Sequence, residues 1–149
     1  MKLEDEIVQP KFNSDYHKVA VNIFYTSNWL TNIHVDALKP HNLTIQQFNI
    51  LRILRGQHPK TVNLKLIKER MLDKMSDVSR LVERLREKGL VDRKTCSSDR
   101  RHIDVIITQK GLDLLKILDK DVNKINSRFS ILTEAEVETL NDLLDKLRG

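Results

Sequence analysis

The segment from Asp73 to Gly111 constrains the fold of this chain more than any other stretch. Its first half, DKMSDVSRLVERLREKGL, has apolar residues at positions i, i+3, i+4 and i+7, which is the spacing of an amphipathic helix. The inward-facing residues are Val78, Leu81, Val82 and Leu85. We expect this helix to begin at Asp73 or Lys74 and to end at Gly89, because glycine commonly follows the last helical residue.

Two short strands follow this helix, VDRKT at 91–95 and DVIIT at 104–108. The cationic tip SSDRR, residues 97–101, lies between them. A helix followed by a β-ribbon with arginines at its turn can present two elements to adjacent grooves of a nucleic-acid duplex. The segment therefore predicts a winged helix-turn-helix.

The rest of the chain predicts further helices on both sides of this segment. The expected helices run from Asn13 or Ser14 to about Leu38, over 43–54, from about Asn63 to Met71, from about Gln109 to Phe129, and from Thr133 onward. Thr44 with Gln47 and Thr133 with Glu136 have the spacing of capping boxes. We expect Gly56 to end the second helix and Thr108 to cap the one that follows the ribbon.

The resulting order, ααααββαα, predicts a mainly α (α+β) protein with one domain over 1–149. A winged-helix DNA-binding lobe is expected at about 43–108, and long terminal helices at about 1–40 and 109–149. These terminal helices carry more apolar surface than such a lobe can cover, so we expect them to be buried against a twofold partner in a homodimer. The alternative is a monomer whose terminal helices pack on the lobe.

The positive charge of the chain is concentrated in its middle. The formal net charge is +5, yet the stretch 60–102 holds 13 Lys and Arg against 7 Asp and Glu. A basic segment that coincides with a groove-shaped motif favours binding of double-stranded DNA. The alternative is a solvated helix face that happens to be basic.

Several other classes of protein are disfavoured by the residues. Cys96 is the only cysteine, which excludes an intrachain disulfide, and no apolar run approaches the length of a membrane span. The polar N-terminus does not resemble a signal peptide, so we expect a cytoplasmic protein without membrane contact. The five histidines are scattered, and no phosphate loop or nucleophile motif is present, so we expect no metal, no cofactor and no enzymatic activity.

The outward face of the helix at 73–88 supplies the candidate DNA contacts. The residues expected near base edges are Ser76, Asp77, Ser79 and Arg80. Arg80 can hydrogen-bond a guanine through two nitrogens. Asp77 can orient Arg80 or Arg84, or accept a hydrogen bond from a cytosine. Arg84 and Lys74 are expected on phosphates. For the serines, a solvated surface is an equal alternative.

The tip of the ribbon supplies a second contact. An arginine at a β-turn can enter the minor groove, where narrow A·T-rich stretches concentrate negative potential. Asp99 is expected to hold this turn or to fix Arg101 by an ion pair. A solvated hairpin turn is the alternative interpretation.

These motifs together resemble the MarR family of bacterial winged-helix regulators. The family pattern DxRxxxxxLTxxG is matched by Asp99, Arg101, Thr108 and Gly111, with Ile107 in place of leucine. VSRLVERLREKGLVDR is similar to the recognition helix and first wing strand of that family, and the terminal helices to its dimerisation region. The resemblance implies a homodimer on a pseudo-palindromic operator, with Arg101 in the minor groove and Arg100 on the adjacent backbone.

The same resemblance implies an effector crevice, because members of this family often bind small aromatic acids. The candidate ligand-binding residues, for a small aromatic or lipophilic effector, are Tyr25, Trp29, Ile33, His34, Phe48 and Arg52. Ordinary core packing is the alternative for them.

The leading hypothesis is thus a sequence-specific transcriptional regulator, a repressor released by a ligand. One rival is a winged-helix module for protein–protein assembly, whose basic face would dock on an acidic partner. The other is a thiol-based redox sensor that uses Cys96, against which an inert thiol is the simpler interpretation.

Overall fold

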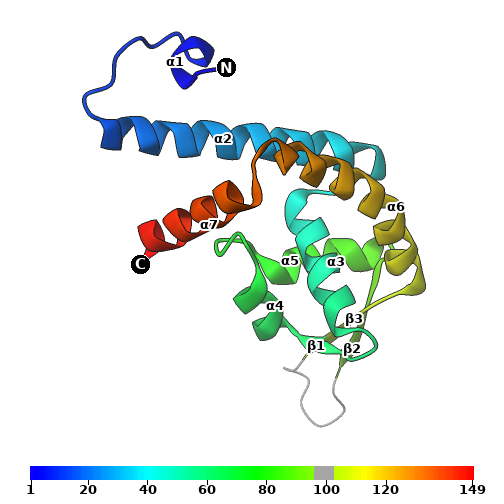
Figure 1. The fold of residues 1–149 in the computed structure, drawn as a ribbon. Coiled ribbons are helices and arrows are strands. Elements are labelled where there is room, and N and C mark those ends of the chain that lie inside the picture. The colour runs from blue at the N-terminus through cyan, green and yellow to red at the C-terminus, as the bar shows by residue number, and fades with distance from the viewer. Residues whose placement is uncertain (96–102) are drawn as a thin grey trace. The chain divides into compact units, whose positions relative to one another are not determined.

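A computed structural model describes residues 1–95 and 103–149, which form two units, 1–43 and 44–149 (Figure 1). The described elements are α1 (Leu3–Glu6), α2 (Asp15–Leu38), η1 (Lys39–His41), α3 (Ile45–Gln57), β1 (Val62–Asn63), α4 (Leu64–Arg70), α5 (Val78–Glu87), β2 (Val91–Thr95), β3 (Ile103–Ile107), α6 (Gln109–Asn126), η2 (Ser127–Ile131) and α7 (Glu134–Arg148). The mainly helical fold with a small antiparallel sheet is confirmed. No helix in the described part of the chain is long and apolar enough to cross a membrane.

The unit of residues 1–43 consists of α2 with a short helix before it. Ser14 caps α2 by accepting the His17 N–H, and the helix ends at Leu38, as the sequence predicts. The sequence predicts no helix before Asn13, whereas α1 forms there. Two side-chain contacts tie α1 to α2: the ammonium of Lys18 lies 2.5 Å from the Glu4 carboxylate, and the Tyr25 hydroxyl donates to Glu6 at 2.6 Å.

The unit of residues 44–149 begins with the predicted capping box. The Thr44 hydroxyl accepts the Gln47 N–H at 3.1 Å, and the Gln47 side chain accepts the Thr44 N–H at 3.2 Å. The prediction that Gly56 ends this helix is wrong, because α3 continues to Gln57. A Cβ at Gly56 would meet no atom within 4 Å, so this glycine occupies an ordinary helical position with no need for special backbone freedom.

Helix α5 begins later than predicted. Its N-cap is Asp77, whose carboxylate accepts the Arg80 N–H at 3.1 Å, and the residues from Leu72 to Ser76 form a separate turn. The expected start at Asp73 or Lys74 is therefore wrong. Both aspartates are good capping residues, and the sequence does not tell which of them starts the helix.

The far end and the buried face of α5 agree with the prediction. Val78, Val82 and Leu85 are buried and Leu81 is half-buried. Gly89 follows the helix with φ of +70°, a left-handed conformation that glycine adopts without steric penalty.

The sheet has the order β1–β3–β2, with both pairs antiparallel. In the hairpin, Val91 pairs with Ile107 and the register continues to the pair of Thr95 and Ile103. Strand β1, which the sequence analysis missed, adds a third strand through the pairing of Val62 with Val105. Two residues are too few to show the alternation that reveals a strand.

The core of this unit lies between α3, α4, α5, the sheet and α6. Its fully buried side chains include Ile50, Leu51, Leu54, Ile67, Val82, Leu85, Val91, Val105, Leu115 and Leu118. Arg55 of α3 donates to both carboxylate oxygens of Asp119 on α6, at 2.9 and 3.0 Å. Hydrophobic packing and this bidentate ion pair therefore both join α6 to α3.

The C-terminal helices follow the predicted caps. The Thr108 hydroxyl accepts the Gly111 N–H at the start of α6, and Thr133 with Glu136 forms the second capping box, at the start of α7. Helix α6 ends at Asn126 and continues as η2, so its end lies slightly before the expected Phe129. No residue of α7 is buried.

Candidate nucleic-acid interface

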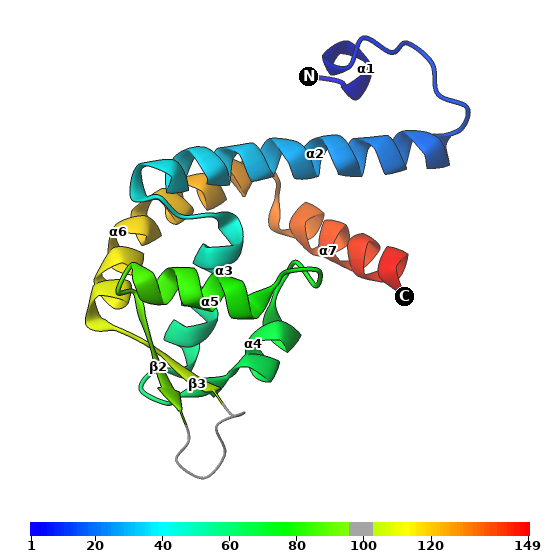
Figure 2. The same cartoon turned by 180° about the vertical axis from the view of Figure 1, so that it is seen from behind.

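Helix α5 and the β2–β3 hairpin lie next to each other in the unit of residues 44–149 (Figure 2). Strand β2 starts four residues after α5 ends, and the two elements contact each other. The first turns of such a helix are the part that reaches into a major groove, while a hairpin beside it can reach the neighbouring backbone or minor groove.

The turn that precedes α5 is held by the Asp73 carboxylate. It accepts the Met75 N–H at 3.0 Å and the Gln46 amide of α3 at 3.4 Å. These two hydrogen bonds, the backbone one first, lower the pKa of Asp73 below its ordinary value of 3.8. Lys74 is exposed and its ammonium donates to the Glu69 carbonyl at 2.6 Å, which leaves its other protons free for a phosphate.

Two residues expected on the outward helix face precede the helix instead. Ser76 is half-buried in the turn, and Asp77 is exposed as the N-cap. Their predicted position on the helix was wrong because the helix starts at Val78. Since the Asp77 carboxylate bonds the Arg80 backbone N–H, it fixes the first turn of α5 and does not pair with the Arg80 side chain.

Ser79, Arg80 and Arg84 lie on the exposed face of α5, as predicted. Neither arginine forms an ion pair with any residue in the described ranges 1–95 and 103–149. Their guanidinium groups are therefore available to acceptors on another molecule.

Two other arginines, Arg86 of α5 and Arg93 of β2, are not available in the same way. The Glu83 carboxylate of α5 accepts from Arg86 at 2.6 Å and from Arg93 of β2 at 2.6 Å. Hydrogen bonds from these two residues, Arg86 first, lower the pKa of Glu83 below its ordinary value of 4.5. The sequence does not predict this network, because the pairing of Arg93 with Glu83 joins a strand to a helix and has no local signal.

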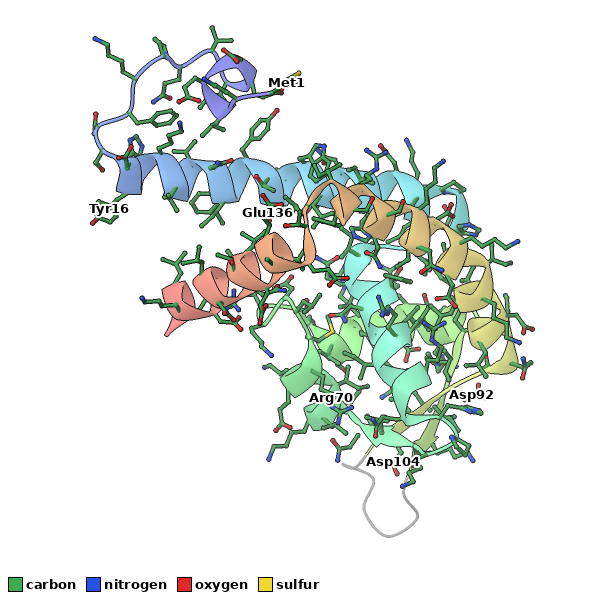
Figure 3. All side chains as sticks on the ribbon, viewed as in Figure 1. Met1, Tyr16, Arg70, Asp92, Asp104 and Glu136 are labelled. Carbon is green, nitrogen blue, oxygen red and sulfur yellow. The ribbon has the colours of Figure 1, made fainter. Side chains whose placement is uncertain are left out.

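The tip of the hairpin lies outside the described residues. Asp99, Arg100, Arg101 and Cys96 all belong to it, so their predicted roles stay predictions. The two strands that carry the tip are described, with Asp92 on β2 and Asp104 on β3 (Figure 3). The Asp104 carboxylate accepts from the Thr61 hydroxyl at 3.4 Å.

The predicted effector residues lie on elements of both units. Tyr25, Trp29, Ile33 and His34 are on α2, and Phe48 and Arg52 are on α3. Within the second unit, the Arg52 guanidinium lies over the Phe48 ring, 5.9 Å from its centroid. Within the first, the hydrogen bond to Glu6 raises the pKa of Tyr25 above 10.0. Among residues 1–95 and 103–149, no cluster of three His, Cys, Asp or Glu side chains could hold a metal ion.

A capped recognition helix, two exposed arginines on it and an antiparallel hairpin beside it define a winged helix-turn-helix DNA-binding protein. Comparisons with known proteins give the family. The model described as the MarR family matches residues 43–103. The HTH-type transcriptional regulator MhqR of Bacillus subtilis is 31% identical over 120 residues, which span 78% of this chain and 80% of that protein. MgrA of Staphylococcus aureus is 34% identical over 109 residues, 73% of this chain and 72% of MgrA.

Solved structures agree with this assignment. A MarR transcription factor from Planctomyces limnophilus matches with a TM-score of 0.71 and 30% identity over 91% of this chain and 98% of that one. A mutant of MarR from E. coli, in complex with operator DNA, shares the fold with a TM-score of 0.76 at 23% identity, over 99% of each chain. The chain belongs to the MarR family and is a DNA-binding transcriptional regulator.

Proposed function

We propose that this regulator is a ligand-responsive repressor that binds a pseudo-palindromic operator as a homodimer in the cytoplasm. The observation that carries the proposal is the exposed pair Arg80 and Arg84 on a capped helix next to the hairpin. IacR of Pseudomonas putida, a transcriptional repressor, is 29% identical over 125 residues, which supports the repressor role. Residues 43–108 would form the DNA-binding lobe, and residues 1–40 and 109–149 the dimerisation region.

On DNA, the first turn of α5 would enter the major groove. Arg80 would read a guanine and Ser79 a neighbouring base, while Arg84 and Lys74 would bind phosphates. Asp77 would hold the start of α5 as its N-cap, and Ser76 would act as part of the turn that precedes this helix. At the hairpin tip, Arg101 would enter the minor groove, with Asp99 fixing it and Arg100 on the backbone.

The experiment is selection of bound duplexes from random DNA, followed by titration of the selected duplex. Arg101→Ala should weaken binding to every sequence, whereas Arg80→Ala should also relax the preference at one base pair in each half-site, by about 1–3 kcal/mol. Lys116→Ala, which removes an exposed cation from α6, is the control and should leave affinity unchanged. Full affinity in both arginine variants would contradict the assignment of the interface.

The proposed dimer rests on apolar surface that α7 leaves exposed. Val137, Leu140, Leu143 and Leu147 are 38–64% exposed along one helix. Val137 also lines an open groove of about 690 Å³, together with Phe129 and Leu132. Exposed apolar surface on this scale is usual for an interface between subunits.

Light scattering and sedimentation of the full chain test the dimer. The double variant Leu140→Glu with Leu147→Glu should be monomeric and should lose affinity for the selected duplex, with its helical circular dichroism retained. Thr139→Glu places one such charge on another exposed position of α7 and should stay dimeric. A strictly monomeric wild-type protein would rule the proposal out.

The proposed effector is a small aromatic compound. Two structural neighbours support this class: RdhR was solved with 2,4-dichlorophenol, and BpsR is regulated by 6-hydroxynicotinic acid. Trp29 is the only tryptophan, so its fluorescence reports on the predicted residues of α2. Either compound, if it binds there, should change this fluorescence and release the duplex. No change with both would exclude effectors of these two kinds.

A further inference from the structure

The turn between α4 and α5 exposes two large apolar side chains. Leu72 is 85% exposed and Met75 is 92% exposed. Within the described residues of 44–107, no other large hydrophobic side chain is exposed. Single exposed apolar residues are common on protein surfaces, but two on one short turn beside a recognition helix form a local feature that needs a partner.

This turn is fixed in place by side chains of α3. The Leu72 N–H donates to the side-chain carbonyl oxygen of Asn49 at 2.9 Å, and the Asp73 carboxylate joins the Met75 N–H to the Gln46 amide. Backbone that is already ordered loses little conformational entropy when it binds. The two apolar side chains are therefore presented on a rigid support.

Charges of both signs flank the two side chains: Asp73 and Asp77 are exposed, as are Lys74 and Arg80. Met75 lies two residues before the N-cap Asp77, and Lys74 and Arg80 are exposed on either side of it in the sequence. Because this turn directly precedes α5, whose first turn is proposed to enter the major groove, DNA is the partner that its position favours. The ammonium of Lys74 donates to the backbone carbonyl of Glu69 on α4.

We propose that Leu72 and Met75 are specificity-determining residues that contact thymine 5-methyl groups in the major groove. The inference rests on the proposed docking of α5. The edge of a base pair in that groove presents one strongly apolar feature, the methyl group of thymine, and apolar side chains recognise it by contact. Met75, which is nearer the helix start, would make the closer contact, and Leu72 would pack beside it.

The test replaces thymines of the selected duplex with deoxyuridine, one position at a time. This change removes the methyl group and keeps every hydrogen-bonding group of the base. Because removing one buried methyl costs about 0.8 kcal/mol, affinity should fall about fourfold at one or two positions in each half-site. Those positions should lie next to the base pair that Arg80→Ala affects.

Variants of Met75 and Leu72 test the same contact from the protein side. In Met75→Ala, affinity for the thymine duplex should fall by a similar factor, and deoxyuridine at the critical position should cause no further loss. Met75→Leu retains an apolar side chain and should retain the penalty for deoxyuridine. Leu72→Ala should reduce this penalty without removing it.

The possible outcomes distinguish a failure of this inference from a failure of the proposed function. If no duplex is selected, the proposed function fails. If a duplex binds but deoxyuridine has no effect at any position, or Met75→Ala keeps the wild-type penalty at every thymine, the methyl contact is overturned and DNA binding stands. A selected site without thymine near the α5 contacts would also overturn it.

Discussion

Removing the Glu83 carboxylate should make this protein bind DNA more strongly and less selectively. In the folded chain Glu83 accepts hydrogen bonds from Arg86 and Arg93, both at 2.6 Å. Its lowered pKa keeps the carboxylate charged throughout the pH range in which DNA binding is measured. In Glu83→Gln the charge is lost, and in Glu83→Ala the acceptor is lost as well, so both arginines become available to phosphates.

The size of the effect follows from the number of arginines released. Each further phosphate contact steepens the slope of log affinity against log salt by about 0.9. If one or both arginines bind a phosphate in Glu83→Ala, the slope of log affinity against log salt should be steeper than that of the wild type by about 0.9 to 1.8. Between 200 and 50 mM salt the variant should therefore gain about 3- to 12-fold in affinity relative to wild type.

The assay is titration of a fluorescent duplex without the selected site, repeated over a range of salt concentrations. The selected duplex is titrated in parallel, and the ratio of the two affinities should fall in the variant, because non-specific binding rises most. Asp113→Asn on α6 makes the same change of charge at an exposed position and serves as the control. An unchanged slope in Glu83→Ala would refute the claim that this carboxylate withholds Arg86 and Arg93 from DNA.

Two further predictions concern stability and ionisation. Gly111→Ala should destabilise the fold by about 1–3 kcal/mol in urea unfolding, because a Cβ there would stand 2.4 Å from the Leu90 carbonyl oxygen. In Gly56→Ala the added Cβ would meet no atom within 4 Å, so this variant should stabilise the fold by about 0.5–1 kcal/mol. If both variants changed the free energy of unfolding in the same direction, the difference in packing around the two glycines would be contradicted. The hydrogen bond to Glu6 raises the pKa of Tyr25. The stabilisation that this bond gives to the folded state is therefore complete below pH 10.0, and it is lost as the pH rises through the pKa of Tyr25 in the folded protein. Glu6→Gln should shift the absorbance titration of tyrosinate to lower pH, and an unshifted titration would count against this bond.

The features that sequence predicted well are those fixed by residues near one another in the chain. The capping boxes at Thr44 and Thr133 are such features, because the cap and its partner are three residues apart. The left-handed Gly89 is another. The start of α5 was missed because Asp73 and Asp77 both look like caps, and only the folded chain shows that the first holds a turn.

The features that sequence could not give depend on contacts between distant residues. Glu83 looks like one more outward-facing acid until β2 brings Arg93 to it. The exposure of Met75 was equally hidden, since a methionine next to a helix start is as compatible with a core as with a surface. The pairing of Glu83 and the exposure of Met75 both decide which side chains of the candidate interface are available to DNA. Amino-acid composition does not contain this information.

The acids within the basic segment explain why its charge excess overstates what it offers to a phosphate backbone. Asp73 holds the turn, Asp77 caps α5 and Glu83 occupies two arginines, so each reduces attraction to any duplex while fixing the geometry of the interface. A regulator must distinguish its site from a large excess of other DNA, and lower non-specific affinity improves that ratio as effectively as a new base contact. On this argument the three carboxylates favour selectivity over strength, and Arg80 and Arg84 are left as the arginines of α5 without an ion pair among the described residues, available for the proposed contacts with the operator.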